Sequence, residues 1–125
     1  PDSIDLELDL GEALEAVEMD RGIILRVLDN IMRNAIEAMP EGGKLTVKAE
    51  RKEGEVHIKM ADSGKGIPEE VVPRIFEPFY TTKPKGFGLG LPFCKRALEA
   101  LGGKIDFETK KGEGTTFTIR LPLKA

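Results

Sequence analysis

Apolar residues recur at helical spacing between residues 23 and 36 more regularly than anywhere else in the sequence. The repeat consists of Ile23, Ile24, Val27, Leu28, Ile31, Met32, Ala35 and Ile36. Asp20 stands where an N-cap belongs, and Pro40 followed by "EGG" ends the pattern. A helix with one apolar side becomes stable by burying that side against a second layer. Other segments of the chain must therefore form that second layer.

Segments that alternate between polar and apolar residues predict that the second layer is a β-sheet. They are residues 4–10, 13–19, 44–50, 55–61, 104–109 and 115–122. Polar or glycine-rich turns separate the third from the fourth and the fifth from the sixth, so each of these pairs is expected to form a β-hairpin.

Two further helices are expected, at residues 69–76 and in the segment from Leu89 to Leu101, where apolar residues share one helical face. Pro73 interrupts the first, and Gly102 with Gly103 ends the second. We predict an α/β (α+β) two-layer sandwich, with a mostly antiparallel five-stranded mixed sheet and about three helices packed on one face.

Length and charge limit the classes of function. A chain of 125 residues with no linker or repeat is expected to form a single domain over residues 1–125. Its net charge of -3 argues against nucleic acid as a partner. No apolar run approaches the length of a transmembrane helix, and residues 1–10 lack the basic and apolar regions typical of a signal peptide. Cys94 is the single cysteine, which fits a reducing compartment and a buried thiol.

Amides are scarce in this chain, and the two that occur lie close together. Glutamine is absent, and Asn30 and Asn34 are the only asparagines. This composition, with 33% charged residues, is typical of heat-adapted proteins. One helical turn separates the two asparagines, at the border of the apolar side, where an amide oxygen is placed to bind magnesium. The alternative is a pair of polar boundary residues.

Asp62 directly follows the strand candidate at residues 55–61 and begins the turn "DSGKGIP". Glycines at 64 and 66 allow the backbone to approach a ligand closely, and the carboxylate can accept a hydrogen bond from an exocyclic amine such as that of adenine. The alternative is an ordinary Asx turn between a strand and a helix.

The segment "GFGLGL", residues 86–91, is rich in glycine and opens a helix with Pro92 in its first turn. It is not a P-loop, which requires G-x-x-x-x-G-K-[ST], and it lacks the last glycine of a dinucleotide fingerprint. Its backbone amides, the positive end of the helix, Lys83 and Lys85 would all favour an anion.

Taken in order, these motifs resemble the ATP-binding catalytic domain of sensor histidine kinases, a superfamily that includes DNA gyrase, mismatch-repair ATPases and heat-shock chaperones. The matching segments are "NIMRNAIEAM" (30–39), "DSGKGIP" (62–68), "FEPFYTTK" (76–83), "GFGLGL" (86–91) and "GEGTTF" (112–117). Phe87 departs from the pattern, because threonine or serine is usual there. The resemblance covers nearly the whole chain.

The resemblance implies roles for individual residues. Asn34 would bind the magnesium ion of Mg-ATP, supported by Asn30. Asp62 would accept a hydrogen bond from adenine, helped by a water near Thr115, in a pocket shaped by Gly64, Gly66 and Ile67. Residues 81–86 would form the lid over ATP. The nucleotide-binding residues in and after this lid would be Thr81, Thr82, Lys83, Gly86, Gly88, Leu89, Gly90 and Leu91.

The resemblance also implies partners. The domain would donate the γ-phosphoryl group of ATP to a histidine on a separate dimerisation domain of the same kinase, which would pass it to a response regulator. His57, the single histidine, alternates with apolar residues in a strand candidate and is expected to be an ordinary sheet residue. We expect a cytoplasmic domain without direct membrane contact, cut from a longer kinase that could itself be membrane-anchored.

Two alternatives stay open at this point. A serine kinase of the anti-sigma-factor kind shares the motifs, and a nucleotide-binding interaction module would have no transfer activity. The residue at position 30 affects the rate of ATP hydrolysis, because family members that hydrolyse ATP carry a glutamate there that activates water. An amide cannot accept that proton, so slow ATP hydrolysis is expected.

Overall fold

The computed structural model describes residues 4–9, 21–76 and 90–122. Its elements are β1 (Ile4–Asp9), α1 (Arg21–Glu37), β2 (Gly43–Lys52), β3 (Glu55–Asp62), the 3₁₀ helix η2 (Val72–Arg74), α2 (Gly90–Ala100), β4 (Lys104–Lys110) and β5 (Gly114–Pro122). The expected strand at 13–19 and the N-cap at Asp20 lie outside the described residues. Each of the other five predicted strands is present.

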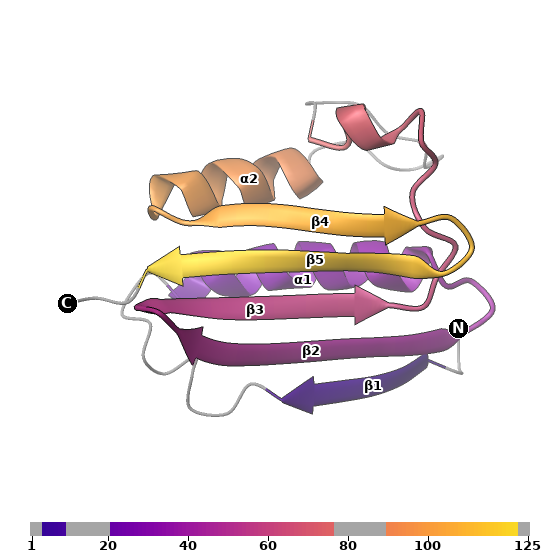
Figure 1. The fold of residues 1–125 in the computed structure, drawn as a ribbon, viewed down its shortest axis with the longest axis horizontal. Coiled ribbons are helices and arrows are strands. Elements are labelled where there is room, and N and C mark those ends of the chain that lie inside the picture. Colours follow the sequence, from indigo (N-terminus) through magenta and orange to yellow (C-terminus); the bar gives the residue numbers. More distant parts are fainter. Residues whose placement is uncertain (1–3, 10–20, 77–89, 123–125) are drawn as a thin grey trace.

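The strands form one mixed sheet in the order β1-β2-β3-β5-β4 (Figure 1). β1 runs parallel to β2, whereas the β2–β3, β3–β5 and β4–β5 pairs are antiparallel. The hairpins β2–β3 and β4–β5 are the two that the polar and glycine-rich turns predict. The predicted five-stranded, mostly antiparallel sheet is confirmed.

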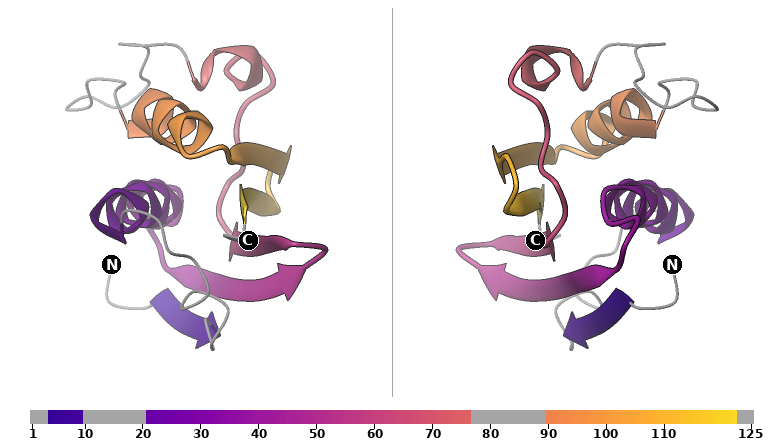
Figure 2. Two further views of the ribbon diagram at one scale, coloured as in Figure 1. Left: turned by 90° about the vertical axis from the view of Figure 1, so that its left-hand side faces the viewer. Right: turned by 90° about the vertical axis from the view of Figure 1, so that its right-hand side faces the viewer.

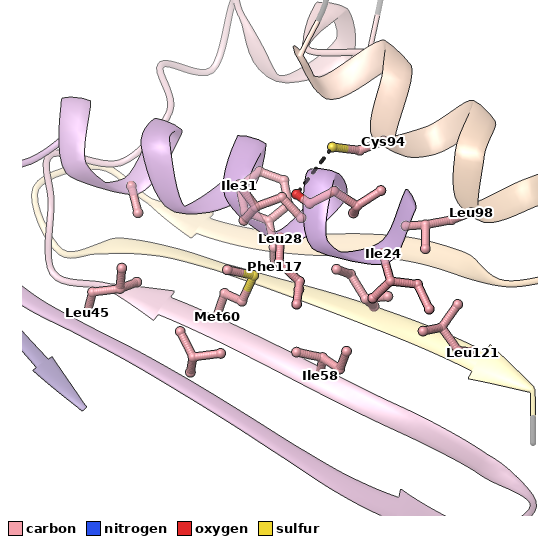
Figure 3. Close-up of a cluster of buried hydrophobic side chains, with 14 of the residues drawn as sticks. Ile24, Leu28, Ile31, Leu45, Ile58, Met60, Cys94, Leu98, Phe117 and Leu121 are labelled. Atoms are coloured by element: carbon pink, nitrogen blue, oxygen red, sulfur yellow. Dashed lines mark hydrogen bonds between the residues drawn. The ribbon is translucent and has the colours of Figure 1, made fainter. Parts of the chain in front are cut away.

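Both α-helices pack on the same face of the sheet, so the domain has two layers (Figure 2). Alternate residues of the central strands point into the space between the layers, where Val56, Ile58 and Met60 of β3 are almost fully buried. Figure 3 shows side chains of α1 meeting those of the sheet, with Leu98 of α2 beside them. No helix in the described ranges is long and apolar enough to span a bilayer.

The prediction of a third α-helix, at residues 69–76, is wrong. Residues 69–76 form turns and the three-residue 3₁₀ helix η2, so the described part of the chain has two α-helices. Pro73 lies inside this segment and has no N–H to donate to a helical hydrogen bond, which explains why the apolar spacing there does not produce an α-helix.

The end of α2 follows the prediction. The N–H of Gly103 donates to the carbonyl of Leu98 at 2.7 Å, and the N–H of Gly102 donates to the carbonyl of Glu99 at 3.0 Å. This pair of hydrogen bonds is the Schellman arrangement that commonly ends a helix at glycine. The turn directs the chain from α2 straight into β4.

Cys94 holds α2 against α1. Its side chain is fully buried, and its Sγ donates to the carbonyl oxygen of Val27 at 3.6 Å, as Figure 3 shows. Burial raises the pKa of the Cys94 thiol to about 11.

A thiol with this pKa in this position is expected to be inert in the folded protein, because the thiolate is the reactive form. At pH 8 we expect an aromatic disulfide reagent to label the native chain about 100-fold more slowly than the denatured chain, in which one thiol reacts. Spectrophotometric labelling with and without denaturant measures this. Rapid labelling of the native chain would contradict the packing of α2 on α1.

Candidate functional site

Asp62 is the last residue of β3, and the backbone around it holds its carboxylate in place. The Oδ1 atom accepts hydrogen bonds from the N–H of Gly64 at 2.8 Å and from the N–H of Thr115 at 3.3 Å. The first is the Asx turn of the ordinary alternative, whereas the second comes from β5. Across the described residues no partner for Oδ2 is found. One carboxylate oxygen is therefore left to accept from a ligand.

A row of polar side chains continues from Asp62 across the sheet. Asp62 pairs with Thr115 of β5, which in turn pairs with Thr109 of β4, so all three lie on the helix-covered side of the sheet. Thr115 is 5% exposed, and its Oγ1 lies 2.8 Å from the Oγ1 of Thr109. Thr109 also accepts from the N–H of Ile67 at 2.8 Å.

Thr109 is the residue of this site that the sequence motifs miss. The alternation of β4 places it on the same side as Ile105 and Phe107, so a hydroxyl stands where the pattern calls for an apolar residue. A polar residue at a core-facing position of a strand end is the signal that would have found it.

The turn between β3 and η2 is packed too tightly for side chains at its glycines. A Cβ at Gly64 would come within 2.6 Å of the carbonyl oxygen of Ala38, and one at Gly66 within 2.5 Å of that of Lys110. Lys65 ties the turn to both neighbours, because its N–H donates to Ala38 at 3.2 Å and its carbonyl accepts from Gly112 at 2.8 Å. The turn is thus fixed between the end of α1 and the β4–β5 hairpin.

Asn30 and Asn34 lie half-buried on α1. The Nδ2 of Asn34 donates to the backbone carbonyl of Asn30 at 2.9 Å, and the Asn30 side chain hydrogen-bonds with Cys94 of α2. Ala38, one turn after Asn34, contacts the Gly64 turn. The backbone at the end of α1 therefore links the asparagines to the turn that Asp62 begins.

A magnesium ion fits this site only if its ligand oxygens come largely from elsewhere. The described residues contain no group of three histidine, cysteine or acidic side chains that could hold a metal. The Asn34 amide oxygen is a suitable but weak ligand. Phosphate oxygens and water would supply the rest of the coordination shell, as is usual for magnesium bound with nucleotides.

The rest of the predicted site lies at or before the start of α2. Thr81, Thr82, Lys83, Gly86, Gly88 and Leu89 are outside the described residues. Gly90 begins α2, and Leu91 is half-buried against the core. Phe76 packs edge-on against Phe107 at 6.0 Å between ring centres. Phe76, the first residue of the segment "FEPFYTTK", therefore lies against the core beside β4.

Burial gives the Asp62 carboxyl an unusual pKa. Removal from water raises the pKa above the ordinary value of 3.8, and the hydrogen bonds from Gly64 and Thr115 oppose this rise. At a pH between the unfolded and the folded pKa, the Asp62 carboxyl therefore keeps a proton in the folded chain that it releases in the unfolded chain. The stabilising contribution of this group is complete below the unfolded pKa and is lost as the pH rises through the raised pKa.

We expect Asp62→Asn to remove that pH dependence, because an amide does not titrate. The free energy of unfolding of the variant, minus that of the wild type, should rise with pH above about 4 and then level off. Denaturant titrations between about pH 3.5 and pH 7 measure both values. A difference that stays constant over this range would mean that Asp62 titrates normally.

The opposite face of the sheet carries a separate polar hollow of about 370 Å³. It is lined by Thr46, Lys48, Lys59, Ala61, Glu108, Thr116 and Thr118. None of the predicted site residues lines it, so the hollow is distinct from the Asp62 turn.

The comparisons with known proteins agree with this geometry. Residues 19–125 match the family model described as "Histidine kinase-, DNA gyrase B-, and HSP90-like ATPase". Because the match covers most of the chain, the chain belongs to this family of ATPase domains.

Within this family, the chain is similar to kinases, including a sensor histidine kinase. The chain is 42% identical over 106 residues to sporulation kinase C of Bacillus subtilis, covering 85% of this chain and 25% of that protein. It is 37% identical over 120 residues to the sensor histidine kinase ZraS of Escherichia coli, covering 96% of this chain and 26% of that protein. The chain thus spans about a quarter of the length of these relatives.

Among solved structures, the catalytic domain of the histidine kinase ThkA in a nucleotide-free form is similar throughout. It is 39% identical, with a TM-score of 0.83, and the match covers 96% of this chain and 79% of that chain. The fold is therefore that of a histidine kinase catalytic domain.

Proposed function

We propose that this domain binds Mg-ATP and donates the γ-phosphoryl group to a histidine on a separate dimerisation and phosphoacceptor domain, in two-component signal transduction. The observation that carries the proposal is the Asp62 carboxylate, which is fixed by two N–H donors and keeps Oδ2 for a ligand beside buried Thr115. Family membership and the sensor histidine kinase relatives support the reaction.

Each residue then has a chemical task. Oδ2 of Asp62 accepts from the exocyclic amine of adenine, and the tight turn at Gly64 and Gly66 lets the base approach the backbone. Asn34 offers an amide oxygen to magnesium, which neutralises phosphate charge when bound. Backbone amides near the start of α2 face the phosphates.

The transfer itself needs no acid or base from this chain. An imidazole nitrogen of the acceptor attacks the γ-phosphorus in line, a P–N bond forms, and the bond to the β–γ bridging oxygen breaks to release ADP. Positioning and charge neutralisation supply most of the rate. Asn30 cannot activate water, so we propose that hydrolysis by this domain is slow.

The acceptor lies on a different domain in this proposal. His57 is in the middle of β3 and its Nε2 lies 3.1 Å from the Glu55 carboxylate, so it is part of the sheet surface. The partners are the phosphoacceptor histidine domain of the same kinase and a response regulator. We propose a cytoplasmic location, without nucleic acid or direct membrane contact.

Calorimetric titration of the chain with ATP and with ADP, with and without magnesium, tests the binding step. The proposal predicts binding of both nucleotides and tighter binding of ATP when magnesium is present. Absence of binding under both conditions would overturn it. A serine kinase of the anti-sigma-factor kind and a binding module without transfer activity share this step, and the phosphorylated product separates them from a histidine kinase.

A further inference from the structure

The polar hollow lies on the face of the sheet that the two α-helices leave open (Figure 2). Its shortest side chain is Ala61 of β3, which lies in register between Thr46 of β2 and Thr116 of β5. Longer, charged side chains from β2, β3 and β4 also line it: Lys48, Lys59 and Glu108. A methyl group among longer side chains leaves a space of about 370 Å³, which is within the size range of small-molecule sites.

Two lysines of the hollow face each other without a counter-ion. Lys48 of β2 and Lys59 of β3 are directly opposite in register, and like charges at such positions repel. Within the described ranges neither ammonium group has a carboxylate at ion-pair distance, although Asp9 lies in register with Lys48. Lys44, on the same side of β2, does pair with Glu7 at 3.3 Å. An anion between Lys48 and Lys59 would remove the repulsion.

Three threonine hydroxyls add uncharged donors to the hollow. Lys59 lies opposite Thr118 of β5, and Thr46 and Thr116 line the hollow beside Ala61. The side chains of these threonines form no hydrogen bond with any other described residue. Ammonium groups and hydroxyls together are the donors that phosphate oxygens accept from. This end of the hollow is therefore suited to a phosphate group.

Glu108 gives the other end of the hollow a different chemistry. It lies on β4 opposite Thr116 of β5, so two strand spacings, about 10 Å, separate its strand from that of Lys59. Its carboxylate repels an anion and accepts hydrogen bonds from hydroxyl groups. The hollow thus complements a ligand that is anionic at one end and carries hydroxyl groups at the other.

We propose that this hollow is a second ligand site, which binds a small phosphate monoester with free hydroxyl groups. The phosphate lies between Lys48 and Lys59, and the hydroxyl groups of the ligand donate to Glu108. The site is on the opposite face of the sheet from the Asp62 turn, so the inference does not depend on the proposed function.

Two probes test this site, glycerol 3-phosphate and methyl phosphate, a monoester without hydroxyl groups. Each is titrated into the ¹⁵N-labelled chain at constant ionic strength, and amide chemical shifts are followed by NMR. We expect saturable shifts at Lys48, Lys59 and Thr118, with millimolar affinity and about 3- to 10-fold tighter binding of glycerol 3-phosphate. Shifts that do not saturate, or that occur only at Gly64 and Thr115, would overturn the inference.

Variants of the charged residues test the two ends separately. Lys59→Met should weaken binding of both probes about 5- to 10-fold. Lys104→Met is the matched control, because Lys104 is exposed on the same face but does not line the hollow, and its effect should be less than about twofold. Equal effects of the two variants would reduce the binding to general charge attraction and overturn the inference.

Glu108→Met should bring the affinities of the two probes together, because it removes the acceptor for the hydroxyl groups. An unchanged preference for glycerol 3-phosphate would contradict the assigned role of Glu108 and the class of ligand.

Vesicles of phosphatidylcholine with phosphatidic acid separate a lipid headgroup from a free ester as the source of the phosphate. Phosphatidic acid carries a phosphate monoester but no free hydroxyl group for Glu108, so we expect the chain to stay in the supernatant after centrifugation. Co-sedimentation that Lys59→Met abolishes would assign the hollow to a membrane surface and overturn the proposal of a free ester.

Discussion

Replacing Asp62 with asparagine is expected to weaken ATP binding about 10- to 100-fold, the effect of losing a hydrogen bond to a charged group. Asparagine has the same shape, and its oxygen can still accept from the N–H groups of Gly64 and Thr115. Its amide nitrogen, however, would replace Oδ2 and point a donor at the amine of adenine. The turn should survive while the recognition of the base is lost.

Calorimetry with ATP on the wild type and the variant measures this effect, and circular dichroism establishes that the fold is kept. Asp29→Asn is the matched control, because Asp29 is an exposed carboxylate paired with Arg33 on α1 at 2.9 Å. It should change the affinity less than about twofold. Equal affinities of wild type and Asp62→Asn would show that the base is bound elsewhere.

Gly114→Ala is expected to destabilise the fold by about 3–5 kcal/mol, since it combines backbone strain with overpacking. Gly114 has φ of 132°, and a Cβ there would overlap the carbonyl oxygen of Asp62 and come within 3.2 Å of the Cα of Ser63. The β3 and β5 strands would have to separate at the point where Asp62 and Thr115 meet. Nucleotide binding should be lost together with stability.

The same hairpin provides the control. Gly112 also has a positive φ, 82°, but a Cβ added there would meet no heavy atom within 4 Å. Gly112→Ala should therefore cost only the backbone strain, about 1–2 kcal/mol. Denaturant unfolding of the two variants compares them under the same conditions. Equal losses of stability would mean that the close approach of Gly114 to Asp62 does not add to the cost of the substitution.

The predictable part of the fold came from strong periodicity. The apolar repeat of α1 and the alternation of β1 to β5 are long enough to define each element, and the turns predict the two hairpins β2–β3 and β4–β5. The segment around Pro73 failed because one missing N–H outweighs a short apolar pattern. The parallel pairing of β1 with β2 could be expected only as part of a mixed sheet.

The residues of the candidate site that belong to sequence motifs were predictable. A residue that only the strand register places at the site was not. Asp62, Gly64, Ile67 and Thr115 belong to motifs, and the described structure brings them together. Thr109 belongs to none, since its role depends on the register that places it opposite Thr115. The buried thiol of α2 likewise gains its contact with the first asparagine of α1 from the packing of the two helices. Register and helix packing are tertiary properties that local patterns do not contain.

Phosphoryl transfer to histidine is the central claim, and the chemical stability of the product tests it most directly. The chain is incubated with ATP labelled at the γ-phosphate and with the phosphoacceptor domain of its own kinase, and the labelled protein is then treated with acid and with base. We expect label on the acceptor domain that acid removes and base does not. Acid-stable label would identify a serine kinase. Tight nucleotide binding without any label would identify a binding module, and either result would contradict the claim.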